Sequence, residues 1–213
     1  MANFEISYNK TLNFEGGYAN HPNDMGGETY KGVARKKNPN WEGWPIIDQM
    51  RNKPGFPSNL DSISELQKYI RNFYKAEFWD KFWGDKQSSQ NIANELFDTS
   101  ILCGPGTAIG FLQVALNVLN KGGKLYPEIS EDGNYGMNTN NSIIAYLKKD
   151  DENLLLKILN VLLGYHFIKL SRNKETQEDF IRGWFKRVEL PLNDDNEFRS
   201  QVQNALTFKP LRF

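Results

Sequence analysis

Hydrophobic positions recur along most of the chain with the period of an α-helix, and alternating runs of β-branched residues are nearly absent. A Ser62-x-x-Glu65 capping pattern predicts a helix that runs to about Gly84. Asn3 is placed to cap a first helix that carries Glu15 and stops at Gly16-Gly17. Further helices are predicted over residues 89–102, 107–120, 141–149, 151–173 and 176–188. The pattern favours an all-α fold.

Two stretches interrupt this helical pattern. Residues 18–60 hold many of the glycines and prolines, which is typical of a long irregular loop that forms a functional surface rather than a linker. The sequence "EDGNYG" at residues 131–136 predicts a turn or tight hairpin. We find no internal repeat. A division near residue 88 predicts two closely packed lobes, 1–88 and 89–190, followed by a C-terminal tail over 191–213.

Charge and composition limit the classes of partner. The 26 acidic and 26 basic side chains cancel, so no chain-wide basic field favours nucleic acid or an anionic membrane surface. Cys103 is the single cysteine, so an intrachain disulfide is impossible. His21 and His166 lie far apart in sequence and share no ligand spacing with Cys103. We therefore predict neither a metal nor another cofactor, and no nucleic acid partner.

The N-terminal residues, MANFEISYNK, contain no apolar segment of the kind found in secretory signals. The most apolar stretch, Leu154 to Leu170, contains Lys157 and Lys169, which favours a buried amphipathic helix over stable membrane insertion. We expect a protein made in the cytoplasm without a visible signal peptide. If it acts outside, another factor must release it.

Two carboxylates near the first predicted helix have different expected environments. Glu15 lies in the last turn of that helix, where the negative end of the helix dipole and the rings of Phe14 and Tyr18 would raise its pKa. Asp24 follows in a polar, glycine-rich loop that would keep it ionised. One group can donate a proton and the other can accept one, as glycosidic cleavage requires.

Thr29 lies close to Asp24 in sequence, and Gly26 and Gly27 allow the intervening loop to turn back. The threonine hydroxyl is able to hold a water that Asp24 activates. Attack by this water opposite Glu15 would invert the anomeric centre if the two carboxyls lie roughly 6.5–9.5 Å apart. We therefore predict Glu15, Asp24 and Thr29 as the catalytic residues.

At these residues the sequence resembles glycoside hydrolase family 108, a muramidase and secretion-activator group often found with phage lysis modules. The Glu-Gly-Gly-Tyr motif of the family is Glu15 to Tyr18, and its Asp-x-Gly-Gly-x-Thr motif is Asp24 to Thr29. The spacing from Glu15 to Asp24 is also similar to that of phage-type lysozymes, which use a glutamate, aspartate and threonine triad. The resemblance implies a lysozyme-like helical fold with the long loop at the active-site cleft.

The second half of the chain continues the resemblance. "FDTSILCGPGTAIGFLQVALN" at 97–117 and "EDGNYGMNT" at 131–139 are similar to the C-terminal peptidoglycan-binding region of the family. "GWFKRV" at 183–188 is similar to its closing helix. The resemblance implies bacterial peptidoglycan as substrate and a holin as export partner. It implies hydrolysis of the β-1,4 bond between N-acetylmuramic acid and N-acetylglucosamine.

Several alternatives stay open on the sequence alone. Tyr18, Tyr30, Trp41 and Trp44 are candidate substrate-binding residues that either stack on sugar rings or anchor the long loop. The basic run from Lys31 to Lys37 is either a solvated face or a contact for peptidoglycan carboxylates. The protein itself is alternatively a lytic transglycosylase, or a non-catalytic wall-binding or secretion-accessory protein.

Overall fold

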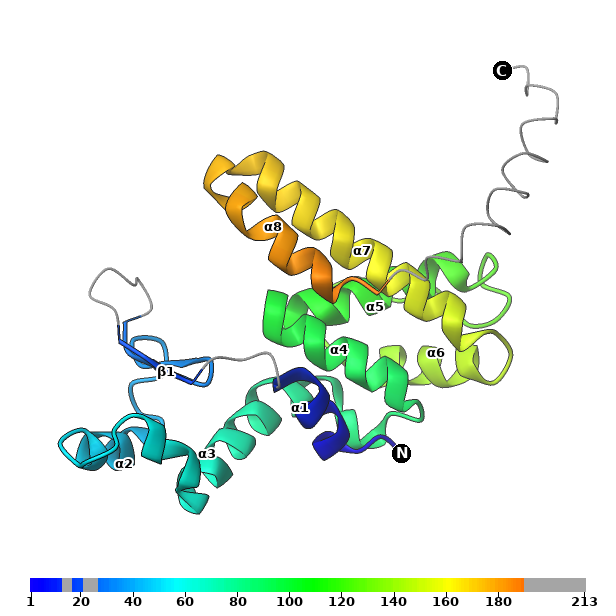
Figure 1. Ribbon diagram of the computed structural model, residues 1–213. Coiled ribbons are helices and arrows are strands. Elements are labelled where there is room, and N and C mark those ends of the chain that lie inside the picture. The colour runs from blue at the N-terminus through cyan, green and yellow to red at the C-terminus, as the bar shows by residue number, and fades with distance from the viewer. Residues whose placement is uncertain (13–16, 21–26, 190–213) are drawn as a thin grey trace, which may run out of the picture. The chain divides into compact units, whose positions relative to one another are not determined.

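The computed structural model describes residues 1–12, 17–20 and 27–189 (Figure 1). These residues are mostly helical, as the hydrophobic pattern predicts, and include one small antiparallel sheet. The chain divides into two compact units, Met1–Leu156 and Lys157–Phe213. The predicted lobes over 1–88 and 89–190 and the tail over 191–213 stay predictions.

The first helix, α1, covers Phe4–Leu12 and begins where its cap predicts. The Asn3 side-chain oxygen accepts a hydrogen bond from the Glu5 amide at 2.8 Å, which satisfies one of the free N–H groups of the first turn. Phe4, Tyr8 and Thr11 are buried on one face of the helix, as their spacing predicts.

Three short strands follow α1 and were not predicted from the sequence. They are β1 (Tyr18–Ala19), β2 (Thr29–Tyr30) and β3 (Val33–Ala34), paired antiparallel in that order. Tyr18 pairs with Tyr30, and Tyr30 pairs with Val33. Strands of two residues carry too few positions to show an alternating pattern.

The β2–β3 turn consists of Lys31 and Gly32, both with positive φ, 43° and 81°. Two-residue turns of this kind match the twist of the strands, but a lysine adopts the conformation at a cost. Three contacts hold Lys31 there. Its amide donates to the Gly17 carbonyl at 3.1 Å, its carbonyl accepts from the Tyr74 hydroxyl at 2.8 Å, and its ammonium pairs with Asp61 at 2.9 Å.

The segment expected to be irregular contains further structure, namely α2 (Gly43–Met50) and the 3-10 helix η1 (Ser58–Ser62). The Ser62 hydroxyl donates to the Asn59 carbonyl at 2.7 Å inside η1. The predicted Ser62-x-x-Glu65 capping box is therefore wrong. The next helix, α3 (Ser64–Tyr74), begins after Ile63, whose side chain makes no capping hydrogen bond.

The helix predicted to reach Gly84 changes type instead of continuing. After α3 come a π-helical turn, η2 (Lys75–Trp79), and two 3-10 turns, η3 (Asp80–Phe82) and η4 (Gly84–Lys86). The Trp79 side chain is fully buried and lies so close to Gly84 that a Cβ on Gly84 would be 2.1 Å from the indole. Packing of Trp79 against this backbone accounts for the broken helix.

Three helices complete the first unit: α4 (Gln90–Cys103), α5 (Pro105–Leu119) and α6 (Met137–Leu147). Their positions confirm the predicted helices, although α6 begins four residues earlier than predicted. The Ser89 hydroxyl caps α4 by accepting from the Ile92 amide at 3.1 Å, and Pro105 opens α5. α4 packs along both α1 and α5 (Figure 1).

The loop before α6 is organised by Gln113 of α5, which is 1% exposed. Its amide nitrogen donates to the Asp132 carboxylate and the Asn134 carbonyl, each at 3.0 Å. Its amide oxygen accepts from the Gly133 amide at 2.8 Å. The segment "EDGNYG" is therefore a turn, as the sequence predicts. Hydrogen bonds from the buried Gln113 side chain stabilise it.

The second unit contains most of α7 (Glu152–Asn173), then η5 (Glu175–Gln177), α8 (Glu178–Trp184) and η6 (Phe185–Arg187). α7 and α8 lie side by side as a helical hairpin (Figure 1), in which Phe167 stacks on Trp184 at 5.1 Å between ring centroids. α7 is long and apolar enough to cross a membrane, but a buried core helix can have the same length and composition. Absence of stable membrane insertion stays a prediction.

Candidate active site

Two of the three predicted catalytic residues, Glu15 and Asp24, lie outside the described residues, as does His21. The elements on both sides of them are described. Glu15 falls in the connection between α1 and β1, and Asp24 falls in the connection between β1 and β2. Ala19 pairs with Thr29, so the chain on either side of the Asp24 segment is joined by the sheet.

Thr29 lies at the start of β2, with its side chain half-buried. Its hydroxyl donates to the Gly27 carbonyl at 3.2 Å. A hydroxyl has one hydrogen and two lone pairs, so this bond leaves the Thr29 oxygen able to accept a hydrogen bond from a water. Gly27 has φ +70°, a conformation that favours glycine at the second position of the Gly26-Gly27 pair.

Glu28 is the centre of a charged cluster beside the sheet, and its side chain is only 9% exposed. One carboxylate oxygen accepts from the Tyr18 hydroxyl at 2.9 Å and from Arg51 at 2.7 Å. The other accepts from Arg35 at 2.8 Å. The cluster therefore ties β1 to the residue that precedes β2, across the connection that carries Asp24.

Asp48 of α2 completes the cluster. Arg35 donates to both of its oxygens, at 2.7 and 2.6 Å, and Arg51 donates to one of them at 3.0 Å. Two guanidinium groups and two carboxylates thus neutralise each other in a network of charge-assisted hydrogen bonds. The network fixes the hairpin to α2, with Arg35 reaching from just after β3 and Arg51 from the end of α2.

This cluster keeps Glu28 ionised. Burial alone would raise its pKa, but hydrogen bonds from Arg35 and Tyr18 and the charge of Arg51 outweigh burial and lower the pKa. Hydrogen bonds from Arg35 also hold the pKa of Asp48 well below its usual range. The pKa values of Asp61 and Asp85 are lowered as well, chiefly by hydrogen bonds from Lys31 and Lys75, respectively. None of these four carboxyls has the raised pKa that a general acid needs.

The candidate substrate-binding aromatic residues are used mainly inside the protein. Tyr30, Trp41 and Trp44 are 1%, 9% and 2% exposed, and Trp41 contacts both other rings. The Trp44 indole donates to the Asn38 carbonyl at 2.7 Å. These contacts anchor the loop, which is one of the two roles expected of them, and leave little ring surface for a sugar.

Tyr18 is not buried like the other three residues. Its ring packs edge-on against Phe56 at 4.8 Å between centroids, and its hydroxyl is held between Glu28 and Arg51. Contact between any of the four aromatic residues and substrate stays a prediction. The basic run is not a simple solvated face either, because Lys31 pairs with Asp61 and Arg35 pairs with Glu28 and Asp48.

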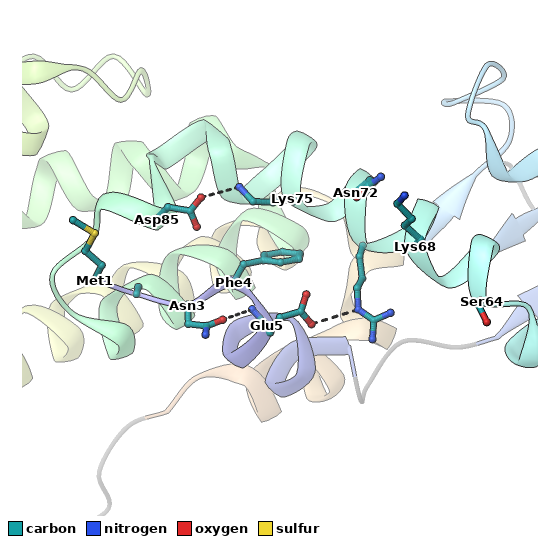
Figure 2. Close-up of a pocket in the computed structure, with 11 residues that line it drawn as sticks. Met1, Asn3, Phe4, Glu5, Ser64, Lys68, Asn72, Lys75 and Asp85 are labelled. Atoms are coloured by element: carbon teal, nitrogen blue, oxygen red, sulfur yellow. Dashed lines mark hydrogen bonds and ion pairs between the residues drawn. The ribbon is translucent and has the colours of Figure 1, made fainter.

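A separate groove of about 680 Å³ lies between the start of α1 and α3 (Figure 2). Its charged side chains are largely paired across it, with Arg71 on Glu5 at 3.4 Å and Lys75 on Asp85 at 2.9 Å. Lys68 of α3 also lines this groove (Figure 2). Two carboxylates of the groove, Glu5 and Asp85, are therefore already engaged by neighbouring cations.

Among residues 1–12, 17–20 and 27–189, no group of three or more His, Cys, Asp or Glu side chains is placed to hold a metal ion. The burial of Cys103, together with the nearby Asp98 carboxylate, raises the pKa of its thiol to about 11. A thiol with so high a pKa is protonated near neutral pH and is a poor nucleophile. The functional groups described around the candidate site are therefore carboxylates, guanidinium groups and hydroxyls.

Residues 8–104 match the model of the family described as glycosyl hydrolase 108. This segment is similar to the glycosyl hydrolase 108 family. Residues 107–189 match a second model, described as "Predicted Peptidoglycan domain". The glycosyl hydrolase 108 match contains Glu15, Asp24, Thr29 and the whole Glu28 cluster. A function that acts on peptidoglycan follows from the two matches together.

A solved structure, that of Brucella abortus SagA, resembles this protein with a TM-score of 0.54. The two sequences are 19% identical, and the alignment covers 94% of each chain. At this identity the likeness establishes the fold alone. The comparison with curated proteins found no match.

Sequence reasoning missed the Glu28 cluster. Arg35, Asp48 and Arg51 lie 7, 20 and 23 residues after Glu28 and come together only because the hairpin folds onto α2. One local signal was available, since Asp48 and Arg51 have the i, i+3 spacing that joins side chains on a helix. That signal identifies a surface pair and says nothing about Glu28.

Proposed function

We propose that this protein is an N-acetylmuramidase that hydrolyses the β-1,4 bond between N-acetylmuramic acid and N-acetylglucosamine, with Glu15 as general acid. The family match across Glu15 and Asp24 supports this proposal. It is also supported by the lowered pKa values of Glu28, Asp48, Asp61 and Asp85, which remove them as rival acids.

In this mechanism Glu15 donates its proton to the glycosidic oxygen while positive charge develops at the anomeric carbon. Asp24 accepts a proton from a water that attacks the opposite face of the sugar ring. Thr29 accepts that water's second hydrogen, because its own hydrogen is committed to the Gly27 carbonyl. The water oxygen then has a lone pair directed at the anomeric carbon, and the product has inverted configuration.

The observation that carries the mechanism is the clamp that Glu28 forms with Tyr18, Arg35 and Arg51. It secures the hairpin on both sides of the segment that contains Asp24. A base and its water must be held within a fraction of an ångström for efficient reaction, and rigid attachment of the loop ends provides that restraint. In this proposal Glu28 positions the catalytic loop and does not itself touch the substrate.

Clearing of purified peptidoglycan by the wild-type protein and by Glu15→Gln tests the proposal. We expect the wild type to clear the suspension and Glu15→Gln to be inactive while remaining folded. Glu42→Gln, an exposed carboxylate before α2, is the matched control and should retain wild-type activity. Substantial clearing by Glu15→Gln would remove Glu15 from its role.

Two alternatives are separated by the products. A lytic transglycosylase needs one acid and no attacking water, so it would leave 1,6-anhydro ends on the released fragments. A non-catalytic wall-binding or secretion-accessory protein would sediment with peptidoglycan sacculi without clearing them. Action on the wall requires release from the cytoplasm, and we propose a holin as the partner for that step.

A further inference from the structure

The side chain of Lys36 lies along the backbone of Gly27, at the end of the β1–β2 connection that carries Asp24. A Cβ on Gly27 would be 3.3, 3.3 and 3.1 Å from the Cγ, Cδ and Cε atoms of Lys36. Three consecutive carbons at such distances show that the lysine stem runs close past the glycine. Because the residue as a whole is exposed, its stem packs on the hairpin while its ammonium group stays in water.

Thr29 contacts the same glycine, since its hydroxyl donates to the Gly27 carbonyl at 3.2 Å. The Arg35 amide donates to the Glu28 carbonyl at 2.8 Å, which extends the pairing of β2 with β3 by one residue. Successive side chains of a paired strand point to opposite faces, so Thr29 lies on the face away from the Glu28 carboxylate. Lys36 is therefore the cation of the basic run that lies beside Gly27 and Thr29.

Two other cations of the run are neutralised elsewhere. Lys31 pairs with Asp61 at 2.9 Å, and Arg35 is held by Glu28 at 2.8 Å and by a second carboxylate of the charged cluster. Lys36 differs from them in where its side chain lies. An ammonium group has three N–H donors, so Lys36 can bind a substrate carboxylate while it keeps a contact within the protein.

The proposed reaction places a carboxylate near this lysine. The water held by Thr29 attacks the anomeric carbon of N-acetylmuramic acid, so that sugar lies over the face of the hairpin on which Thr29 lies. The same sugar carries the peptide stem on its lactyl group. The first free carboxylate along the stem is the α-carboxylate of its second residue, D-glutamate, when that group is not amidated. It is an anionic group close to the reacting sugar, and its charge is complementary to that of Lys36.

We propose that Lys36 is a specificity-determining residue that binds the α-carboxylate of the stem D-glutamate on the muramic acid whose bond is cleaved. The proposal rests on the proposed muramidase function and adds the peptide stem to the substrate that the protein recognises. Packing of the lysine stem on Gly27 restricts the side chain before substrate binds, which reduces the entropy lost on binding. Peptidoglycan in which this carboxylate is amidated binds less tightly.

The test uses two synthetic tetrasaccharides of alternating N-acetylglucosamine and N-acetylmuramic acid. One carries L-Ala-D-isoglutamate stems and the other L-Ala-D-isoglutamine stems, so the stems differ only in the charge of this group. The full-length wild type should have a kcat/KM about threefold higher for the isoglutamate substrate, because an exposed ion pair contributes modestly. The difference should lie in KM and should shrink in high salt. Equal kcat/KM for the two substrates at low salt would overturn the proposal.

Two variants assign the preference to one residue. Lys36→Gln should cleave the two substrates with equal kcat/KM, whereas Lys37→Gln, which removes the next exposed cation in the chain, should keep the wild-type ratio. If Lys36 only supports the loop, its replacement should lower kcat/KM for both substrates by the same factor. A wild-type ratio in Lys36→Gln, or loss of the preference in Lys37→Gln alone, would contradict the proposal.

Binding of the tetrasaccharides separates this proposal from the proposed enzymatic function. If the wild type cleaves neither substrate, the muramidase proposal fails, and calorimetry on the same proteins still tests Lys36. The wild type should then bind the isoglutamate tetrasaccharide about threefold more tightly than the isoglutamine one, and Lys36→Gln should bind both equally. Equal binding of both by the wild type, or binding of neither, would overturn the role of Lys36 as well.

Discussion

The Tyr18 hydroxyl donates a hydrogen bond to Glu28 at 2.9 Å, and this contact joins the two sides of the β1–β2 hairpin. The Glu28 carboxylate is nevertheless ionised, because Arg35 and Arg51 hold it from other directions. A carboxylate so close to the proposed catalytic loop is therefore part of the scaffold.

Glu28→Gln should lower both stability and activity. The substitution leaves Arg35 and Arg51 with Asp48 as their only carboxylate partner in the cluster. It should cost about 2 kcal/mol of unfolding free energy, less than loss of a fully buried pair, because both guanidinium groups are about one-third exposed. Loosening of the loop should reduce kcat by about tenfold to a hundredfold. Urea titration and hydrolysis of glycan strands measure the two effects.

The control for this prediction is Glu42→Gln, which removes an exposed carboxylate nearby and should change neither quantity. An active Glu28→Gln protein with wild-type kcat would show that the clamp has no part in positioning the catalytic loop.

Stability should decrease as the solution becomes more acidic. The pKa values of Glu28 and Asp48 are lowered on folding from ordinary values of 4.5 and 3.8, so the folded state resists protonation that the unfolded chain accepts. Their contribution is present above those ordinary values and is lost as the pH falls through the folded pKa values. Urea unfolding measured between about pH 3 and pH 7 should show this loss, with a smaller slope in Glu28→Gln. An equal slope in the two proteins would contradict the assignment.

Gly84→Ala should destabilise the first unit strongly. The added methyl would lie 2.1 Å from the fully buried Trp79 indole, which has no room to move away, and overpacking of this kind costs about 3 kcal/mol. Gly110→Ala is the matched control because its Cβ would contact nothing within 4 Å inside α5, where alanine favours the helix. Thermal unfolding of the two variants should change in opposite directions.

Gln113→Leu should unfold the turn before α6 while leaving α5 intact. The substitution removes the amide that binds Asp132, Gly133 and Asn134, and losing its hydrogen bonds to these partly exposed turn groups should cost about 1–3 kcal/mol. Amide hydrogen exchange should accelerate in residues 131–136. Unchanged exchange there would show that the turn is stable without Gln113.

Much of the helical framework follows from the sequence. α1, α4 and α7 have long periodic apolar faces, and the first two have polar caps, Asn3 and Ser89, that act locally. Such signals depend on near neighbours in the chain, which is why they predict these elements well.

The remaining elements depend on contacts between distant residues. The strands of the sheet are two residues long and are defined by pairing and by the Lys31-Gly32 turn. The end of α3 is set by how Trp79 packs on Gly84, and the charged cluster exists only after the hairpin meets α2. Of the predicted triad, the structure describes only Thr29, which lies in β2. Glu15 and Asp24 lie outside the described residues, and their roles stay predictions.

The most direct test of the central claim is the configuration of the first product from peptide-free glycan strands, followed by proton NMR before mutarotation. The account predicts fragments whose new reducing end is N-acetylmuramic acid in the α configuration, because water attacks opposite a departing β-linked group. Fragments that end in 1,6-anhydro sugar, or a new end first seen as the β anomer, would contradict a mechanism in which Asp24 activates water across from Glu15.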